Sequence, residues 1–186
     1  AASGVEYVIV RPTAFFKSLA GQVERVKAGK PFLVFGDGSL TACKPIGEAD
    51  LARYLADCGE DPARTDRILP IGGPGPAITP REQGELLCRL AGVTTNIRSV
   101  PVRLFDAAGA LLAPLAPFSR RFAEKAELAR IGRFYATESM LLWNEQSGAF
   151  DAAATPETGS ETLEAFYERV LREGLEGQEL GAAKIF

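Results

Sequence analysis

Residues 11–17 bring together a rigid turn, a hydroxyl group, two aromatic rings and a cation. The proline fixes the local backbone, and the two adjacent phenylalanines offer flat apolar surface for a planar ring. The lysine can pair with a carboxylate or a phosphate. Because two phenylalanines at a helix start are also common in a plain core, a purely structural role is the alternative. The segment consists of Arg11, Pro12, Thr13, Ala14, Phe15, Phe16 and Lys17.

A second segment, residues 130–140, collects cations, an aromatic hydroxyl and small polar side chains. It shows no helical amphipathicity, so a single buried face does not explain its composition. Arg133 and Tyr135 are its candidate ligand-facing residues. The alternative is a solvated connector.

The chain has no histidine among its 186 residues. Within this chain, that excludes Ser-His-Asp and Cys-His nucleophiles and histidine-bearing zinc sites. The three cysteines, Cys43, Cys58 and Cys88, are far apart, a pattern that predicts reduced thiols and no metal site. A net charge of −3 gives no electrostatic case for nucleic acid as a partner.

A glycine cluster at residues 72–75 invites comparison with a phosphate-binding loop. It lacks the G-x-G-x-x-G spacing, and its prolines remove amide donors that would bind phosphate. We interpret it as a turn between a strand and a helix.

The elements that must position these residues begin with a β-branched run at residues 5–10. Such a run predicts a strand buried on both faces, as in a parallel sheet covered by helices. Residues 11–17 follow its carboxyl end, where open α/β sheets bind ligands. Apolar residues at helical spacing from 15 to 26 then predict a helix that ends at Gly29.

Further along the chain, an Asp-Gly turn at residues 36–39 predicts a β-hairpin formed by residues 31–35 and 40–43. Thr79 and Glu82 form a predicted capping box at a helix start. The other predicted elements are a strand at 67–71, an extended piece at 100–102, helices at 48–58, 123–131 and 162–172, a helical Ala/Leu-rich stretch ending at 117, a turn-rich stretch at 144–160 and a loosely held end from 173.

Several motifs together resemble one family. They are VRPTAFFKSL at 10–19, FGDG at 35–38, ACKPI at 42–46, LPIGGPG at 69–75, IGRFYATESML at 131–141, TLE at 162–164 and EGLEGQELG at 173–181. In these motifs the chain resembles the divinyl chlorophyllide 8-vinyl reductases, of the atypical, NmrA-like branch of the short-chain dehydrogenases. The resemblance spans nearly the whole chain and is weakest at 93–125.

The resemblance implies an α/β fold, namely the C-terminal part of a Rossmann-like NAD(P)-binding fold with a substrate-binding lobe. It implies that residues 1–186 form the C-terminal half of that domain. The Gly-rich dinucleotide loop and the catalytic lysine of the superfamily are then expected upstream, so this chain alone is expected to be inactive.

The resemblance also implies the chemistry: NADPH-dependent reduction of the 8-vinyl group of divinyl chlorophyllide or protochlorophyllide to ethyl, in chlorophyll biosynthesis. Pro12, Thr13, Ala14 and Phe15 would border the nicotinamide. Phe16, Lys17 and Arg133 would contact the substrate, and Tyr135 would donate a proton.

Two other functions stay open. One is an NADPH-dependent reductase of the same branch that acts on another aromatic substrate, such as an isoflavone-like ketone. The other is an NADP-binding redox sensor without turnover. The expected compartment is the chloroplast for an algal or plant protein and the cytoplasm for a bacterial one, with peripheral association with photosynthetic membranes left open.

Overall fold

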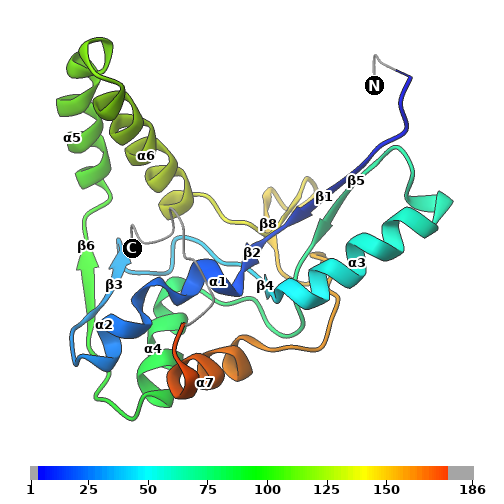
Figure 1. Cartoon of the computed structure of the whole chain (residues 1–186), viewed down its shortest axis with the longest axis horizontal. Coiled ribbons are helices and arrows are strands. Elements are labelled where there is room, and N and C mark those ends of the chain that lie inside the picture. Colours follow the sequence, from blue (N-terminus) through cyan, green and yellow to red (C-terminus); the bar gives the residue numbers. More distant parts are fainter. Residues whose placement is uncertain (1–3, 176–186) are drawn as a thin grey trace.

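The computed structural model describes residues 4–175. Helices and short strands alternate along most of this length, and three short 3₁₀ turns connect them (Figure 1). The elements are β1 (Val8–Pro12), β2 (Ala14–Phe15), α1 (Phe16–Leu19), η1 (Ala20–Gln22), α2 (Val23–Lys27), β3 (Phe32–Phe35), β4 (Pro45–Ile46), α3 (Glu48–Glu60), η2 (Pro62–Arg64), β5 (Arg67–Ile71), α4 (Pro80–Leu90), β6 (Ile97–Val100), α5 (Arg103–Leu112), η3 (Ala113–Phe118), α6 (Arg120–Thr137), β7 (Leu142–Asn144), β8 (Ala149–Asp151) and α7 (Leu163–Glu173).

Parallel pairing dominates the strands. β1 pairs with β5, β2 with β4 and β3 with β6, all in parallel, while β7 and β8 form an antiparallel hairpin. Parallel strands need crossover connections, and helical segments lie on the connections between these partners. The α/β class predicted from the sequence is therefore present in the described residues.

β1 is a parallel strand as predicted, but it is not buried on both faces. On one face Val10 packs with Ile71 of β5 and Leu51 of α3. On the other face Ile9 and Ile68 are 46% and 55% exposed. The prediction of two-sided burial was wrong for residues 4–175, because a β-branched run identifies a strand, whereas burial depends on which elements cover it.

The predicted hairpin of residues 31–35 and 40–43 does not form. β3 pairs with β6 instead, and Cys43 forms an antiparallel bridge with Ile78. The Asp-Gly turn itself exists, with Gly38 at φ 80°. The turn signal fixed the bend correctly, but it did not determine the direction in which the chain leaves it.

The helix predicted after Pro12 is divided into α1, η1 and α2, and the chain leaves α2 at Gly29 with φ 70°. Its inward residues join the main core together with α4 and α7. That core contains Phe16, Ala20, Val23, Val26, Phe32, Val34, Leu87, Cys88, Leu163, Phe166, Tyr167 and Val170.

Four other predictions are confirmed. β5 has the predicted bounds, and α3 extends two residues beyond its predicted end. α4 begins with the capping box, in which the Glu82 carboxylate accepts a hydrogen bond from the Thr79 amide at 2.7 Å. α7 begins after Thr162, whose hydroxyl accepts from the amide of Ala165. Of the end predicted to be loosely held, residues 176–186 lie outside the described part of the chain.

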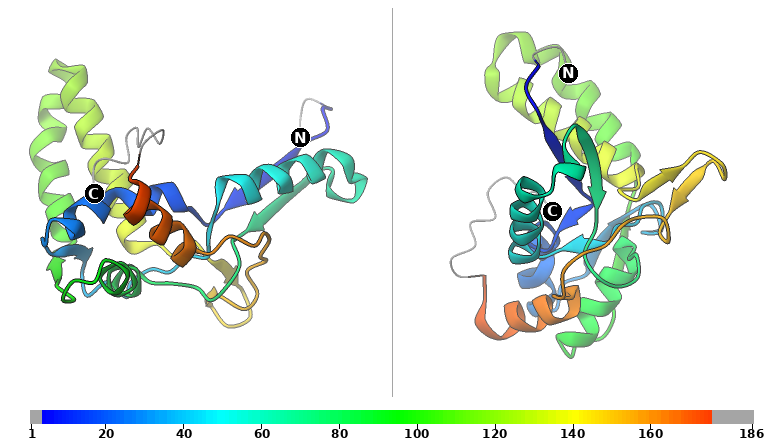
Figure 2. Two further views of the ribbon diagram at one scale, coloured as in Figure 1. Left: turned by 60° about the horizontal axis from the view of Figure 1, so that its bottom comes forward. Right: turned by 90° about the vertical axis from the view of Figure 1, so that its right-hand side faces the viewer.

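α6 is longer than predicted and carries Arg133 and Tyr135 on a regular helix. With α5 it forms an arm that stands away from the rest of the molecule (Figure 1 and the left view of Figure 2). The buried residues of α6 are Ala129, Gly132 and Ala136, and the Phe105 ring of α5 lies against Gly132. This contact face consists of small residues, so large apolar side chains do not mark its periodicity in the sequence.

Candidate functional site

The carboxyl ends of β1 and β5 place two of the motifs side by side. Pro12 lies opposite Ile71 in the parallel register, and the amide of Thr13 donates to the carbonyl of Ile71 at 3.0 Å. Residues 12–15 therefore leave the sheet next to residues 72–75. Open α/β sheets bind ligands at these carboxyl ends of the strands, which we call the strand-end edge.

Thr13 ties this edge together from inside. Its side chain is buried, and its hydroxyl donates to the carbonyl of Lys44 and accepts from the amide of Lys44 at 3.1 Å. Both hydrogen bonds go to the backbone just before β4. The Thr13 hydroxyl thus holds the end of β1 against β4, and both the amide and the carbonyl of Lys44 have a hydrogen-bond partner.

Replacing Thr13 by valine is expected to destabilise the protein by about 2 kcal/mol, since the buried amide of Lys44 loses its acceptor and the carbonyl of Lys44 keeps only the amide of Gly73 as a donor. Thr13→Ser should retain most of the stability. Urea unfolding measures the difference, and Thr95→Val, at an exposed position, is the matched control. Equal stability of Thr13→Val and wild type would contradict this role.

The two adjacent phenylalanines have different surroundings. Phe15 is 40% exposed at the end of β2, whereas Phe16 is 2% exposed and packs on Phe166 with ring centroids 5.3 Å apart. Lys17 lies 3.9 Å from the Glu48 carboxylate at the start of α3. Of the two rings, Phe15 is the one that offers surface to a ligand.

Lys44 is a buried cation that the sequence analysis did not single out as a functional residue. Its ammonium group pairs with the Glu157 carboxylate at 3.0 Å, and only 10% of the lysine side chain is exposed. Lysine is rarely buried without a partner, so the pair fastens the segment around Glu157 to the strand ends. Because the two residues are 113 positions apart, local sequence gives no signal for the pair.

The glycine cluster is a crossing point of backbone segments. The amide of Gly72 donates to Pro156 at 2.8 Å, and the amide of Gly73 donates to Lys44 at 3.0 Å. A Cβ atom on Gly73 would lie 2.0 Å from the carbonyl oxygen of Pro45. Close backbone approach therefore accounts for the adjacent glycines without a phosphate loop.

Asp50, near the start of α3, anchors the same region. Its buried carboxylate accepts hydrogen bonds from the amides of Ser160 and Glu161, both at 2.9 Å, and from Arg53. Burial alone would raise the Asp50 pKa, but the hydrogen bonds from Glu161, Ser160 and Arg53 outweigh it and the pKa is lowered. Because Ser160 lies 110 positions away, local sequence gives no signal for this link.

Arg133 and Tyr135 lie near the carboxyl end of α6, the end that returns from the tip of the arm to the rest of the molecule (Figure 1). The Arg133 guanidinium pairs with Asp106 of α5 at 2.8 Å, and Tyr135 is 57% exposed with its ring edge-on to Phe134. Beyond the helix, the Met140 amide donates to Ala42 at 3.1 Å. The second segment thus reaches the strand-end region through residues 139–140. Its Arg133 side chain pairs within the arm, with Asp106 of α5.

The three cysteines are free and buried, and burial raises the pKa of Cys43 to about 12. Within residues 4–175, no group of three or more His, Cys, Asp or Glu side chains could hold a metal ion. The same range contains no helix long and apolar enough to cross a bilayer.

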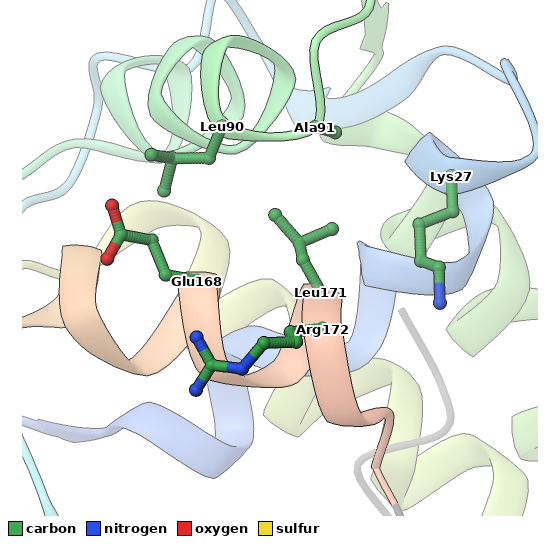
Figure 3. A pocket seen from close by; sticks show the side chains of 6 residues that line it. All are labelled: Lys27, Leu90, Ala91, Glu168, Leu171 and Arg172. Atoms are coloured by element: carbon green, nitrogen blue, oxygen red, sulfur yellow. The ribbon is translucent and has the colours of Figure 1, made fainter.

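A surface hollow lies elsewhere, between α2, α4 and α7 (Figure 3). In it Leu90 and Leu171 extend into the space between the helices, while charged side chains surround them. None of the predicted site residues lines this hollow. We therefore assign no ligand to it.

No family model matches the chain. Curated relatives match over nearly its whole length. It is 54% identical over 180 residues to a protein of Oryza sativa subsp. indica, 53% over 184 residues to one of Cucumis sativus and 50% over 179 residues to one of Arabidopsis thaliana. All three are named divinyl chlorophyllide a 8-vinyl-reductase, chloroplastic. The chain is a homologue of part of the divinyl chlorophyllide a 8-vinyl-reductases.

The matches cover 96–99% of this chain but 43–44% of these relatives. The chain therefore spans less than half the length of the vinyl reductases that it matches. The resemblance predicted from the motifs is confirmed over this part.

Solved structures show the same fold with little sequence identity. A nucleoside-diphosphate-sugar epimerase of Staphylococcus aureus matches with a TM-score of 0.54 and 16% identity, over 90% of this chain and 53% of the epimerase. A solved structure described with the pinoresinol-lariciresinol and phenylcoumaran benzylic ether reductases has the same TM-score and the same coverage, at 20% identity. Both confirm the predicted Rossmann-like α/β class.

Proposed function

We propose that the protein containing this chain reduces the 8-vinyl group of divinyl chlorophyllide to ethyl, with NADPH as the reductant. The observation that carries the proposal is the 50–54% identity, over 96–99% of the chain, to proteins named for this reaction. The reductase-type fold supports a nicotinamide cofactor in general. The choice of NADPH, and of chlorophyllide over protochlorophyllide, belongs to the proposal.

The strand-end edge fits a nicotinamide. Pro12 fixes the backbone at the end of β1, Ala14 adds little bulk, and the exposed Phe15 ring supplies an apolar face. Thr13 holds this segment in place through its hydrogen bonds to Lys44 and, with its neighbours, would border the nicotinamide. When bound, NADPH supplies the hydride; the residues of this chain orient the ring and exclude water beside it.

The remaining half of the cofactor site is proposed to lie in the part of the parent protein outside this chain. β1 and β5 leave one face open at Ile9 and Ile68. In a Rossmann-like sheet, further strands and helices would continue the fold at this face and at the edge of β1 that no strand among residues 4–175 occupies. The dinucleotide loop and the catalytic lysine would reside there.

On the substrate side, Phe15 and the residues near the carboxyl end of α6, Arg133 and Tyr135, are proposed to enclose the pigment. Lys17 and Arg133 carry cations that can pair with its carboxylate, although each already pairs with an acidic side chain that the pigment would have to displace or share. Phe16 would act from behind, by supporting Phe15 from the core. Tyr135 exposes a phenol that can deliver the proton completing the ethyl group.

The direct test is turnover by the full-length parent. With NADPH and divinyl chlorophyllide a, the product should gain two hydrogens at the vinyl group, as read by mass spectrometry and the pigment spectrum. Parallel assays with NADH and with divinyl protochlorophyllide determine cofactor and substrate preference. NADPH binding without any turnover of either pigment would instead support the redox-sensor alternative.

A reductase of another aromatic substrate is the second candidate, and the fold match to benzylic ether reductases is the observation that favours it. Turnover of such a substrate, without pigment turnover, would establish it. The plant relatives are named chloroplastic; we propose the same compartment for a plant or algal parent, the cytoplasm for a bacterial one, and peripheral contact with photosynthetic membranes in either case.

Replacing Phe15 by alanine is expected to weaken pigment binding about tenfold, because it removes one exposed ring from the site at a cost of about 1.4 kcal/mol. Pigment fluorescence titration of the full-length protein measures the change. Leu55→Ala, an exposed apolar position on α3, is the control. An unchanged Kd in Phe15→Ala would remove this ring from the pigment site.

A further inference from the structure

The β7–β8 hairpin carries an exposed pair of aromatic rings. Trp143 and Phe150 face each other across the two strands, with ring centroids 5.1 Å apart and planes at 78°. They are 51% and 39% exposed. Trp143 is the single tryptophan of the chain. Cross-strand aromatic pairs stabilise hairpins, yet this pair leaves much of its ring surface in water.

Most of the exposed aromatic rings among the described residues fall in the stretch of sequence that contains this hairpin. Phe134 and Tyr135, at the end of α6, are 56% and 57% exposed. Together with Trp143 and Phe150, they place four exposed rings within residues 134–150. Phe15 and Phe122 complete the set of exposed large aromatics.

The hairpin is joined to the strand-end edge by its base. The amide of Leu142 donates to the Thr155 hydroxyl at 2.9 Å. Three residues later, Thr158 donates to the carbonyl of Gly72 at 2.9 Å, and Gly72 directly follows β5. On the other side, Met140 donates to Ala42. The aromatic pair therefore projects from a segment that is hydrogen-bonded to the edge where Pro12 to Phe15 emerge.

We propose that Trp143, backed by Phe150, forms a second stacking surface for the macrocycle of divinyl chlorophyllide. This inference rests on the proposed function, which supplies the occupant: a large planar ring system whose faces need aromatic or apolar contacts. The indole face binds the macrocycle, and the edge-on Phe150 ring holds the indole in place. Phe15 contacts the end of the pigment next to the cofactor, while Trp143 contacts a part further from it.

The test uses the full-length protein and divinyl chlorophyllide a. Trp143→Leu and Phe150→Leu keep an apolar contact between the strands but remove one ring each, and Trp143→Phe restores an aromatic ring. Phe122→Leu, an exposed phenylalanine near the start of α6, is the matched control. The measurements are Kd for the pigment without NADPH, KM and kcat for the pigment, Kd for NADPH and the thermal midpoint.

We expect Trp143→Leu to raise the pigment Kd and KM about tenfold, Phe150→Leu to raise them less, and Trp143→Phe to recover most of the affinity. NADPH affinity should stay unchanged in all variants, as should pigment affinity in Phe122→Leu. If the wild-type protein turns the pigment over and Trp143→Leu has the same pigment Kd as the wild type, the inference is overturned.

A fall in NADPH affinity and thermal midpoint, with pigment affinity intact, would also overturn it, because the pair would then contact the rest of the parent protein. If the wild type neither binds nor reduces the pigment, the proposed function itself fails. That result is read from the wild type alone and is thus distinct from a failure confined to the variants.

Discussion

The Tyr135→Phe variant of the full-length protein is expected to lose about 100-fold in kcat, because a positioned general acid contributes at least that much to proton transfer. The phenol of Tyr135 lies on the exposed face of α6 and pairs edge-on with Phe134. The substitution removes one oxygen atom and keeps the ring. Steady-state turnover of divinyl chlorophyllide a, with pigment Kd measured separately, assigns the loss to the chemical step.

Tyr7→Phe is the matched control for this experiment. Tyr7 precedes β1, at the opposite end of the strand from Pro12, and its loss of a hydroxyl should leave kcat unchanged. A kcat for Tyr135→Phe within twofold of wild type would show that the proton comes from another group.

Removing the buried Asp50 carboxylate is expected to cost about 3 kcal/mol of stability, since it leaves the amides of Ser160 and Glu161 without their charged acceptor. Urea unfolding of Asp50→Ala measures the loss. Asp57→Ala, an exposed position on the same helix, should change stability by less than about 0.5 kcal/mol. Comparable losses in the two variants would contradict the anchoring role.

The Asp50 contribution should also depend on pH. Its pKa is lowered in the folded protein, so the stabilisation is complete above the unfolded-state value of about 3.9 and disappears as pH falls through the folded value. The difference in unfolding free energy between wild type and Asp50→Ala should therefore be constant near neutrality and narrow in acid below about pH 4. If this difference in unfolding free energy widened on acidification instead, the pKa of Asp50 would be raised in the folded protein, which would contradict the prediction.

Local signals predicted much of the fold. The capping box at Thr79 and the apolar run of residues 67–71 each specify an element within a few residues of sequence, and both elements have the predicted positions. The family motifs led to the relatives that the chain matches. In contrast, the hairpin at residues 36–39 failed because β3 finds its partner at residues 97–100, beyond the reach of any turn signal.

The candidate site was predictable only in outline. The segment after β1 could be placed at a strand end, but whether Phe15 or Phe16 faces a ligand depends on α7, whose Phe166 covers Phe16. The hydrogen bonds of the Thr13 hydroxyl could not be predicted, because their partner, the backbone of Lys44, is 31 residues away. The Lys44–Glu157 and Asp50–Ser160 links span still longer separations, so no spacing rule in the sequence could reveal them.

The half-open strand pair β1–β5 has a practical consequence for handling the protein. Among residues 4–175, β5 is the strand that pairs with β1, and Ile9 and Ile68 lie bare on one side. Unprotected strand borders with apolar side chains recruit other chains into intermolecular sheets. A recombinant fragment limited to these residues should therefore precipitate or form oligomers through β1. The Ile9→Lys substitution should keep the fragment monomeric.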